Sequence, residues 1–409
     1  MNLMILTVAI YFAPPEPLEL PRLLDEVAAH APAVRVRAAD VDVARTRVGL
    51  AGAWEDPTLS IMSESIPLPG GAMGDPTMIS YRFSQPLNLF GRRGAAKQAA
   101  AAGVGIRQAQ LARSQWDARA QAVGLFYELW MNGEMARLID EQIVLLQRMR
   151  EAGLSRVRAG MQMGHHDVLR AEAEIERMKA ERASLDDERA AMAAMLNALR
   201  GRPQDELIGE PRLPARSPLP PLQAVLGRSG SNPELLGARA MSRSAQADRT
   251  LVGKMYLPMV MVEAEYEQKL DGMPDGLGFS LVLTVPLWWH DRQDREVDMA
   301  DAMVTAADRD VEAMQTMAEA DLRMAWSRAR AAERRLEALE ASAIPRMEET
   351  IKSSEAAYQA GNGDFLSLLE ASMALQELRM ERLRAIVGAG AARFELARVS
   401  GAALEEVKP

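Results

Sequence analysis

The chain has 409 residues, of which 48% are hydrophobic and only 5% are aromatic. This length and apolar content suffice to bury a sizeable core, and the shortage of aromatic side chains is typical of long packed helices. The formal net charge of −9 argues against a nucleic-acid binder, which needs a basic face. These 409 residues contain no cysteine, so none of them can form a disulfide, a thiolate metal site, a cysteine nucleophile or a lipid-attachment cysteine.

The most apolar run of the sequence covers residues 3–13. It is too short to span a bilayer as a helix but suits the core of a signal peptide. The run lacks a preceding basic stretch, and cleavage after Ala13 would place Tyr11 where a small residue is preferred. We expect residues 1–19 to hold a partial signal segment and a proline-rich lead, with a buried N-terminal strand as the alternative.

Proline and glycine recur with a spacing of about 200 residues, which indicates an internal repeat. The matching pairs are Pro32 with Pro233, Pro57 with Pro258, Pro86 with Pro286, and Gly160 with Gly361. We therefore predict a first repeat at 20–200, a proline-rich linker at 201–221, a second repeat at 222–401 and a tail at 402–409.

Each repeat opens with a helical pattern, at about 22–52 and 233–256, and continues with two segments of period-two alternation. Strands are expected at 58–64, 78–84, 257–269 and 279–285, with Gly70-Gly71 and Asp271-Gly272 in the connecting loops. In 257–269 the residues Val260, Val262, Ala264 and Tyr266 fall on one face, and Glu263, Glu265, Glu267 and Lys269 on the other. The strands are thus predicted to be amphipathic.

After the second strand of each repeat, a helical pattern runs without proline as far as Pro203 and Pro345. Its apolar positions step by three and four and are mostly small, which permits close helix packing. They are Ala95, Ala99, Ala102, Ile106 and Ala109 in the first repeat, and Val297, Ala300, Val304, Ala307, Val311, Met314 and Ala318 in the second. Glycines interrupt the pattern before a second helix returns. Since a helix of about 60 residues is about 90 Å long, these hairpins are expected to pack on each other.

The number of strands limits how the sheet can be used. Four strands cannot close a barrel, and open sheet edges are not tolerated in hydrocarbon. A membrane sheet of this size therefore needs further copies, and three chains would supply about twelve strands, within the range of outer-membrane barrels. A soluble α+β protein whose sheet lays its apolar face on helices is the alternative, but helices this long would overhang such a sheet.

Several segments resemble the TolC family of outer-membrane factors. Residues 81–91 (YRFSQPLNLFG) and 279–288 (FSLVLTVPLW) resemble its strand-to-helix transitions. Residues 358–371 (YQAGNGDFLSLLEA) resemble a helix-hairpin tip with its return helix, and 158–171 (RAGMQMGHHDVLRA) is the first copy of that tip. The resemblance covers residues 20–401.

The resemblance implies a mainly α fold with a small β part, in which four strands per chain contribute to a trimeric 12-stranded β-barrel continued by a long α-helical barrel. It implies a homotrimer in the outer membrane that extends into the periplasm and acts as the passive exit duct of an efflux or secretion system. The implied partners are a periplasmic adaptor and an inner-membrane pump, and the chain looks closest to the heavy-metal branch. No cofactor, enzymatic activity or nucleic-acid partner is expected.

Rings of charge around a symmetry axis set the selectivity of a duct. Family carboxylates on the return helix narrow the closed entrance; Glu370 resembles one such position, whereas Ser367 stands where another carboxylate is often found. Asp364 and Asp167 are the other candidate constriction acids, with ordinary acids at a helix N-terminus as the alternative.

Further candidates lie at the tips and on one strand. Gly160, Gly164, Gly361 and Gly363 are expected to permit the chain reversals at the tips, where an adaptor would dock. Glu263, Glu265 and Glu267 are candidates for a lumen-facing row that favours cations, with a solvated edge strand as the alternative.

The first tip also carries His165 and His166 beside Met161 and Met163, side chains that suit soft or borderline metal ions. Their spacing is poor for a defined site, and methionine commonly fills helix seams, so these are weak candidates and no metal site is assigned. Two other functions are alternatives: a periplasmic adaptor or coiled-coil scaffold, and a metal-dependent hydrolase using His165, His166 and Asp167. Duplicated hairpins joined by strand pairs argue against an adaptor, and the sequence shows no phosphate loop or nucleophile elbow.

Overall fold

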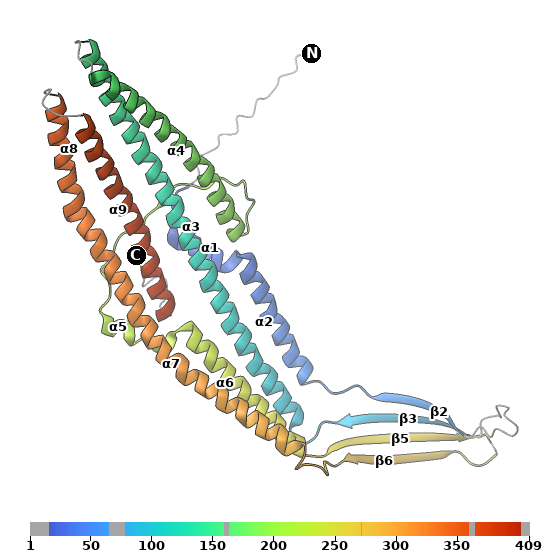
Figure 1. Cartoon of the computed structure of the whole chain (residues 1–409). Helices are drawn as coiled ribbons and strands as arrows, with labels where there is room; N and C mark the ends of the chain where they lie inside the picture. The colour runs from blue at the N-terminus through green and yellow to red at the C-terminus, as the bar shows by residue number, and fades with distance from the viewer. Residues whose placement is uncertain (1–15, 65–77, 159–162, 271, 360–364, 402–409) are drawn as a thin grey trace, which may run out of the picture. The chain divides into compact units, whose positions relative to one another are not determined.

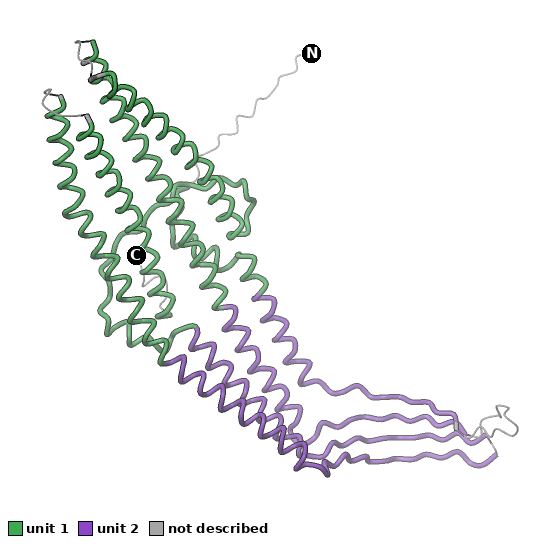
Figure 2. The backbone as a smooth tube through the Cα atoms, viewed as in Figure 1, with its two compact units in different colours: residues 1–36, 112–233, 316–409 green, residues 37–111, 234–315 purple. Residues whose placement is uncertain are grey.

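The computed structural model describes residues 16–64, 78–158, 163–270, 272–359 and 365–401 (Figure 1). Residues 1–15 of the predicted leader, Gly70-Gly71, Asp271, the tail 402–409, and the tip residues Gly160, Met161, Gly361, Gly363 and Asp364 lie outside these ranges. The chain forms two compact units (Figure 2). We call residues 37–111 and 234–315 the sheet unit, and residues 1–36, 112–233 and 316–409 the hairpin unit.

The sheet unit contains the four predicted strands. These are β2 (Thr58–Glu64), β3 (Met78–Leu87), β5 (Met259–Lys269) and β6 (Gly276–Thr284), and they pair antiparallel in the order β2-β3-β5-β6. The central pair joins the two repeats, with the rings of Tyr81 and Tyr266 stacked at 6.1 Å between centroids. Each repeat therefore supplies one half of a single sheet.

Four helices continue from the strands of this unit: α2 (Pro32–Ala51), α3 (Arg92–Arg158), α6 (Pro233–Val252) and α7 (Gln293–Ala338). Small residues bring α3 and α6 together, since a Cβ on Gly105 would lie 3.9 Å from that of Ala240. Helix α6 is tied to α7 by Ser242, whose Oγ donates to Asp308 Oδ1 at 2.6 Å. Helices α3 and α6 thus lie between α2 and α7, the order of the strands to which they connect (Figure 1).

The hairpin unit contains the two predicted helix hairpins. In the first, α3 is followed by α4 (Met163–Arg200); in the second, α7 leads through η4 (Leu339–Ala343) and α8 (Ile344–Gln359) to the return helix α9 (Phe365–Ser400). Both hairpins contribute to one buried cluster: Ile139, Leu146, Met149, Ala171, Ile175, Met178, Leu185, Tyr358, Leu368 and Leu369. A buried hydrogen bond from Gln142 Nε2 to Ser372 Oγ, 3.3 Å long, adds a specific link between them. The expected packing of hairpin on hairpin is confirmed.

The long helix of the second repeat is interrupted by a π-helical turn, η4, which the sequence pattern did not predict. Pro345 is the second residue after this turn. Proline lacks the N–H that would bond four residues back, and its ring clashes with the carbonyl group there. A wider turn just before the proline relieves both problems, and π turns of this kind are common at functional positions.

The duplication is visible where the return helices end. Gly201 follows α4 with φ +70°, and Gly401 follows α9 with φ +60°, a conformation that glycine adopts without strain. A Cβ on Gly201 would press against the carbonyl oxygen of His30, and one on Gly401 against that of Ser231. The same contact is therefore made in both repeats, about 200 residues apart.

The remaining elements are short. The predicted helix at 22–52 is divided into α1 (Leu20–His30) and α2, because Pro32 begins a new helix. The second repeat begins with α5 (Leu222–Leu226) and η2 (Ser229–Ser231), and η3 (Gly253–Tyr256) follows α6. Strands β1 (Leu18–Glu19) and β4 (Pro211–Arg212) form a parallel pair that was not predicted, since two residues carry no periodicity. Among the described residues, every helix is too short or too polar to cross a membrane.

Packing of the two hairpins can be tested at Leu146, which is fully buried in their shared cluster. Leu146→Ala is expected to lower the free energy of unfolding by about 2–5 kcal/mol, because it removes apolar contacts and leaves a cavity. The measurement is the unfolding midpoint of detergent-purified protein. Leu207→Ala is the control, since Leu207 is 68% exposed and its truncation should change stability by less than about 0.5 kcal/mol. Equal effects at the two positions would contradict this packing.

Candidate functional site

The polar face of the sheet carries the three predicted strand acids. The alternation of β5 places Glu263, Glu265 and Glu267 on one face, opposite Ser84, Arg82 and Ser80 of β3 respectively. Arg82 Nη2 donates to both carboxylate oxygens of Glu265, at 3.0 and 3.2 Å. The hydroxyl groups of Ser84 and Ser280 donate to Glu263 at 3.2 and 3.0 Å. The row therefore exists, but its middle acid is ion-paired and its first is hydrogen-bonded on both sides.

The other face of the same sheet is apolar and bare. Its exposed side chains are Leu59, Ile61, Phe83, Val262, Tyr266, Leu277, Phe279, Leu281 and Leu283. Phe279 is 79% exposed, and Figure 1 shows no helix of the sheet unit lying over the strands. Soluble monomers rarely expose a continuous apolar patch of this kind. The alternative of a soluble protein with its sheet packed on helices is inconsistent with the described part of the chain.

The described residues near the hairpin tips include three of the predicted candidates. Glu370 lies on α9 next to the buried Leu368 and Leu369, and its own side chain is exposed. Asp167 is partly exposed near the start of α4, and Gly164 lies in the first turn of that helix. The position of Glu370 outside the cluster core leaves its carboxylate accessible.

His165 and His166 are exposed on α4 beside Asp167. Within the ranges that the structure describes, no three histidine or acidic side chains are grouped closely enough to hold a metal ion.

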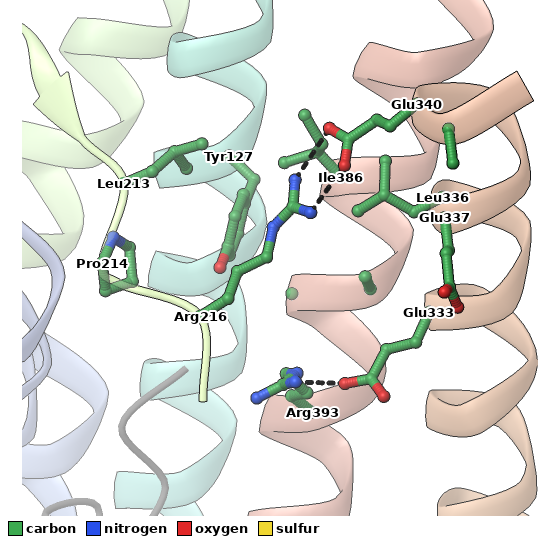
Figure 3. Close-up of a pocket in the computed structure, with 13 residues that line it drawn as sticks. Tyr127, Leu213, Pro214, Arg216, Glu333, Leu336, Glu337, Glu340, Ile386 and Arg393 are labelled. Carbon is green, nitrogen blue, oxygen red and sulfur yellow. Dashed lines mark hydrogen bonds and ion pairs between the residues drawn. The ribbon is translucent and has the colours of Figure 1, made fainter. Parts of the chain in front are cut away.

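A cavity of about 480 Å³ lies in the hairpin unit beside the π turn (Figure 3). Its wall is formed by the linker residues Leu213, Pro214 and Arg216, by Tyr127 of α3, by Glu333, Leu336 and Glu337 of α7, by Glu340 and Ala341 of η4, and by Ile386, Ala389, Gly390 and Arg393 of α9. The lining includes apolar side chains and two ion pairs, Arg216 with Glu340 and Arg393 with Glu333 (Figure 3). The cavity was not predicted from the sequence.

Glu340 fastens the linker to the π turn. The guanidinium of Arg216 donates to its two carboxylate oxygens at 2.8 and 3.1 Å, and Arg382 Nε donates to one of them at 2.8 Å. The hydrogen bond from Arg216 is the main cause that holds the pKa of Glu340 below its ordinary value, with Arg382 adding to the effect and burial opposing it. We call Arg216, Glu340 and Arg382 the linker clamp.

A second set of contacts holds the linker at Ser217, the residue after Arg216. Arg393 donates to the carbonyl oxygen of Ser217 and pairs with Glu333. The ring of Tyr127 occupies the space that a side chain at Gly390 would need, so only glycine fits there. Burial raises the pKa of the Tyr127 hydroxyl, and the charge of Arg393 partly offsets this. The linker between the repeats is thus held against the second hairpin from several sides.

The sequence profile described as outer membrane efflux protein matches residues 23–202 and 229–402, once in each half of the chain. The chain belongs to the outer membrane efflux protein family. Membership places it among outer membrane efflux channels, as the sequence resemblance implied.

One sequence relative is named for metal resistance. The nickel-cobalt-cadmium resistance protein NccC of Alcaligenes xylosoxydans xylosoxydans is 25% identical over 323 residues, which cover 76% of this chain and 70% of NccC.

Solved structures of outer-membrane channels share the fold. The outer membrane protein VceC of Vibrio cholerae aligns with a TM-score of 0.77 at 17% identity, over 94% of this chain and 96% of VceC. CusC, a protein that forms a transmembrane channel, aligns with a TM-score of 0.79 at 14% identity, over 97% of this chain and 96% of CusC. The whole architecture, from the sheet to the hairpins, is thus that of the outer membrane efflux family.

The linker clamp can be tested by pH. Glu340→Gln is expected to lower the free energy of unfolding by about 1 kcal/mol at neutral pH, a value that allows for the partial exposure of Arg216. Because the folded-state pKa of Glu340 is depressed, its stabilising contribution is complete above the ordinary value of about 4.3 and is lost as pH falls through the folded-state pKa. The difference in the free energy of unfolding between wild type and Glu340→Gln should therefore disappear at acidic pH.

The measurement for this test is the unfolding midpoint of both proteins between about pH 3 and pH 8. Glu337→Gln is the matched control, since Glu337 lines the same cavity but is exposed and makes no ion pair among the described residues. A difference in unfolding midpoint between wild type and Glu340→Gln that stays the same at acidic pH would argue against the clamp.

Proposed function

We propose that three copies of this chain form the exit duct of a tripartite efflux system, in which a 12-stranded β-barrel in the outer membrane continues into an α-helical barrel. The observation that carries this proposal is the open sheet. β2 and β6 each have one neighbour in the described sheet, so their outer edges carry backbone N–H and C=O groups that need partners. In a membrane these groups have to be paired, and β2 of one copy with β6 of the next satisfies them.

The helices beside these edge strands support the same contact. Val36, Val43 and Leu50 are spaced by seven residues along α2 and are 60%, 52% and 75% exposed. Helix α7 carries a second exposed stripe, Met299, Met303, Met317 and Met324. Since α2 leads into β2 and α7 follows β6, a neighbouring copy that pairs with the edge strand brings the two stripes together. Apolar stripes with a heptad spacing are typical of helix–helix seams.

We further infer that the duct conducts metal ions passively, driven by an inner-membrane pump and joined to it by a periplasmic adaptor at the tips. The similarity to NccC, named for resistance to nickel, cobalt and cadmium, supports this substrate class. The members of the family are channels, and we infer that this chain likewise conducts without catalysing a reaction. Gly160, Gly164, Gly361 and Gly363 mark the two tips at which the adaptor would bind.

The proposed constriction lies near the same tips. The exposed carboxylate of Glu370 would form a ring of three around the axis, with Asp167 and Asp364 as additional acids. Ser367, one turn before Glu370, adds no charge to this ring.

The trimer is tested on protein extracted from the outer membrane in detergent. We expect a mass near three times the 44.8 kDa of one chain, and discrete single-channel currents in a planar bilayer. Leu50→Glu should abolish both, because it buries an unpaired carboxylate in the helix seam.

Gly49→Glu is the matched control for this test. It introduces the same carboxylate one residue earlier on α2, away from the Val36–Val43–Leu50 stripe and at a position where a Cβ would have no other atom within 4 Å. The control should retain the trimer and its currents. A monomeric, water-soluble wild type without conductance would refute the channel and favour a coiled-coil scaffold.

The constriction is tested by Glu370→Ala. Removing three carboxylates from a narrow entrance is expected to raise the closed-state conductance, because it removes the groups that close the ring. The measurement is the single-channel conductance in a planar bilayer, with Glu172→Ala, an exposed acid on α4, as the control. A conductance equal to that of wild type would remove Glu370 from the gate.

A further inference from the structure

We propose that Arg82 determines the ion preference of the sheet-lined part of the channel by neutralising the central acid of its glutamate row. The inference rests on the proposed function, because it takes the polar face of the sheet to be the face toward the lumen. It assigns a selectivity role to a basic residue on β3 that sequence reasoning, which considered only the acids of β5, did not identify.

The geometry of the pair is specific. Arg82 and Glu265 lie directly opposite each other in the register of β3 and β5, and Arg82 Nη2 contacts both oxygens of the carboxylate. The side chains are 40% and 27% exposed, so the charges are accessible to water and ions. Because the backbone pairing of β3 with β5 fixes the positions of Arg82 and Glu265 relative to each other, the two charges stay close together.

The other two acids of the row are in different surroundings. Glu263 accepts hydrogen bonds from Ser84 and Ser280, which orient the carboxylate without cancelling its charge. Glu267 pairs across the sheet with Ser80 and Gly276, neither of which carries charge. The pair formed by Arg82 and Glu265 therefore separates two carboxylates. The charged side chains on this face of β5, three glutamates and Lys269, have a net charge of −2 per chain by themselves, and Arg82 of β3 reduces it to −1.

The influence of these wall charges on the permeability of cations and anions depends on the salt concentration. A charge on the wall acts over roughly the Debye length, which is about 30 Å at 0.01 M ionic strength and about 3 Å at 1 M. The wall charges should therefore influence ions across a wide lumen in dilute salt and lose this influence in concentrated salt. This dependence distinguishes an electrostatic role of Arg82 from a purely structural one.

The test is the reversal potential of single channels under a KCl gradient near 0.01 M, repeated near 1 M. Arg82→Gln leaves Glu265, like Glu263 and Glu267, without an arginine partner. It should raise the cation-to-anion permeability ratio by about twofold in dilute salt. Glu265→Gln leaves Arg82 without its carboxylate and should shift the ratio toward anions. The double variant Arg82→Gln/Glu265→Gln restores the net charge and should return the ratio close to that of wild type.

Two controls keep the proposal open to refutation. Arg82→Lys retains the charge, so its ratio should stay near that of wild type even if the conductance changes. All shifts should disappear near 1 M salt. Shifts of the same sign in Arg82→Gln and Glu265→Gln, or an unchanged ratio in both, would overturn the role of Arg82. Absence of any current from wild-type protein would instead refute the channel itself.

Discussion

An antiparallel sheet of four strands leaves two rows of backbone hydrogen-bonding groups at its edges, and the rest of this structure depends on that constraint. The central pairing of β3 with β5 joins one hairpin from each repeat, so the duplication yields a single sheet and not two. One face of the sheet is apolar and uncovered, and the other carries serine, arginine and glutamate. Such a sheet suits a boundary between lipid and water, where its edges have to be paired by further strands.

The helices follow the order that the strands establish. Small residues let α3 and α6 approach closely, and polar contacts join α6 to α7, which leaves α2 and α7 as the flanking helices of the sheet unit. Their exposed stripes of valine, leucine and methionine are what a helix presents when its partner belongs to another copy. The sheet edges and the helix stripes therefore point to one and the same proposed interface.

The linker between the repeats is fixed to the second hairpin of the hairpin unit at several points. It is held to the second hairpin by the linker clamp, by Arg393, and by Trp326, whose Nε1 donates to the carbonyl oxygen of Pro220 at 2.9 Å. The clamp acts on the π turn, a segment that Pro345 prevents from forming a regular α-helix.

The sequence by itself determined the elements, since periodicity, proline and glycine act over a few residues. The alternation in β5, the seam from Ala95 to Ala109 and the repeat spacing predicted the strands, the hairpins and the duplication. Tertiary structure alone decided which charges meet. Arg82 and Glu265 are 183 residues apart, and Arg216 and Glu340 are 124 apart. No local pattern encodes such pairs, because strand register and helix packing create them. For the same reason the strand count predicted open edges, but only the folded sheet identified β2 and β6 as the edge strands.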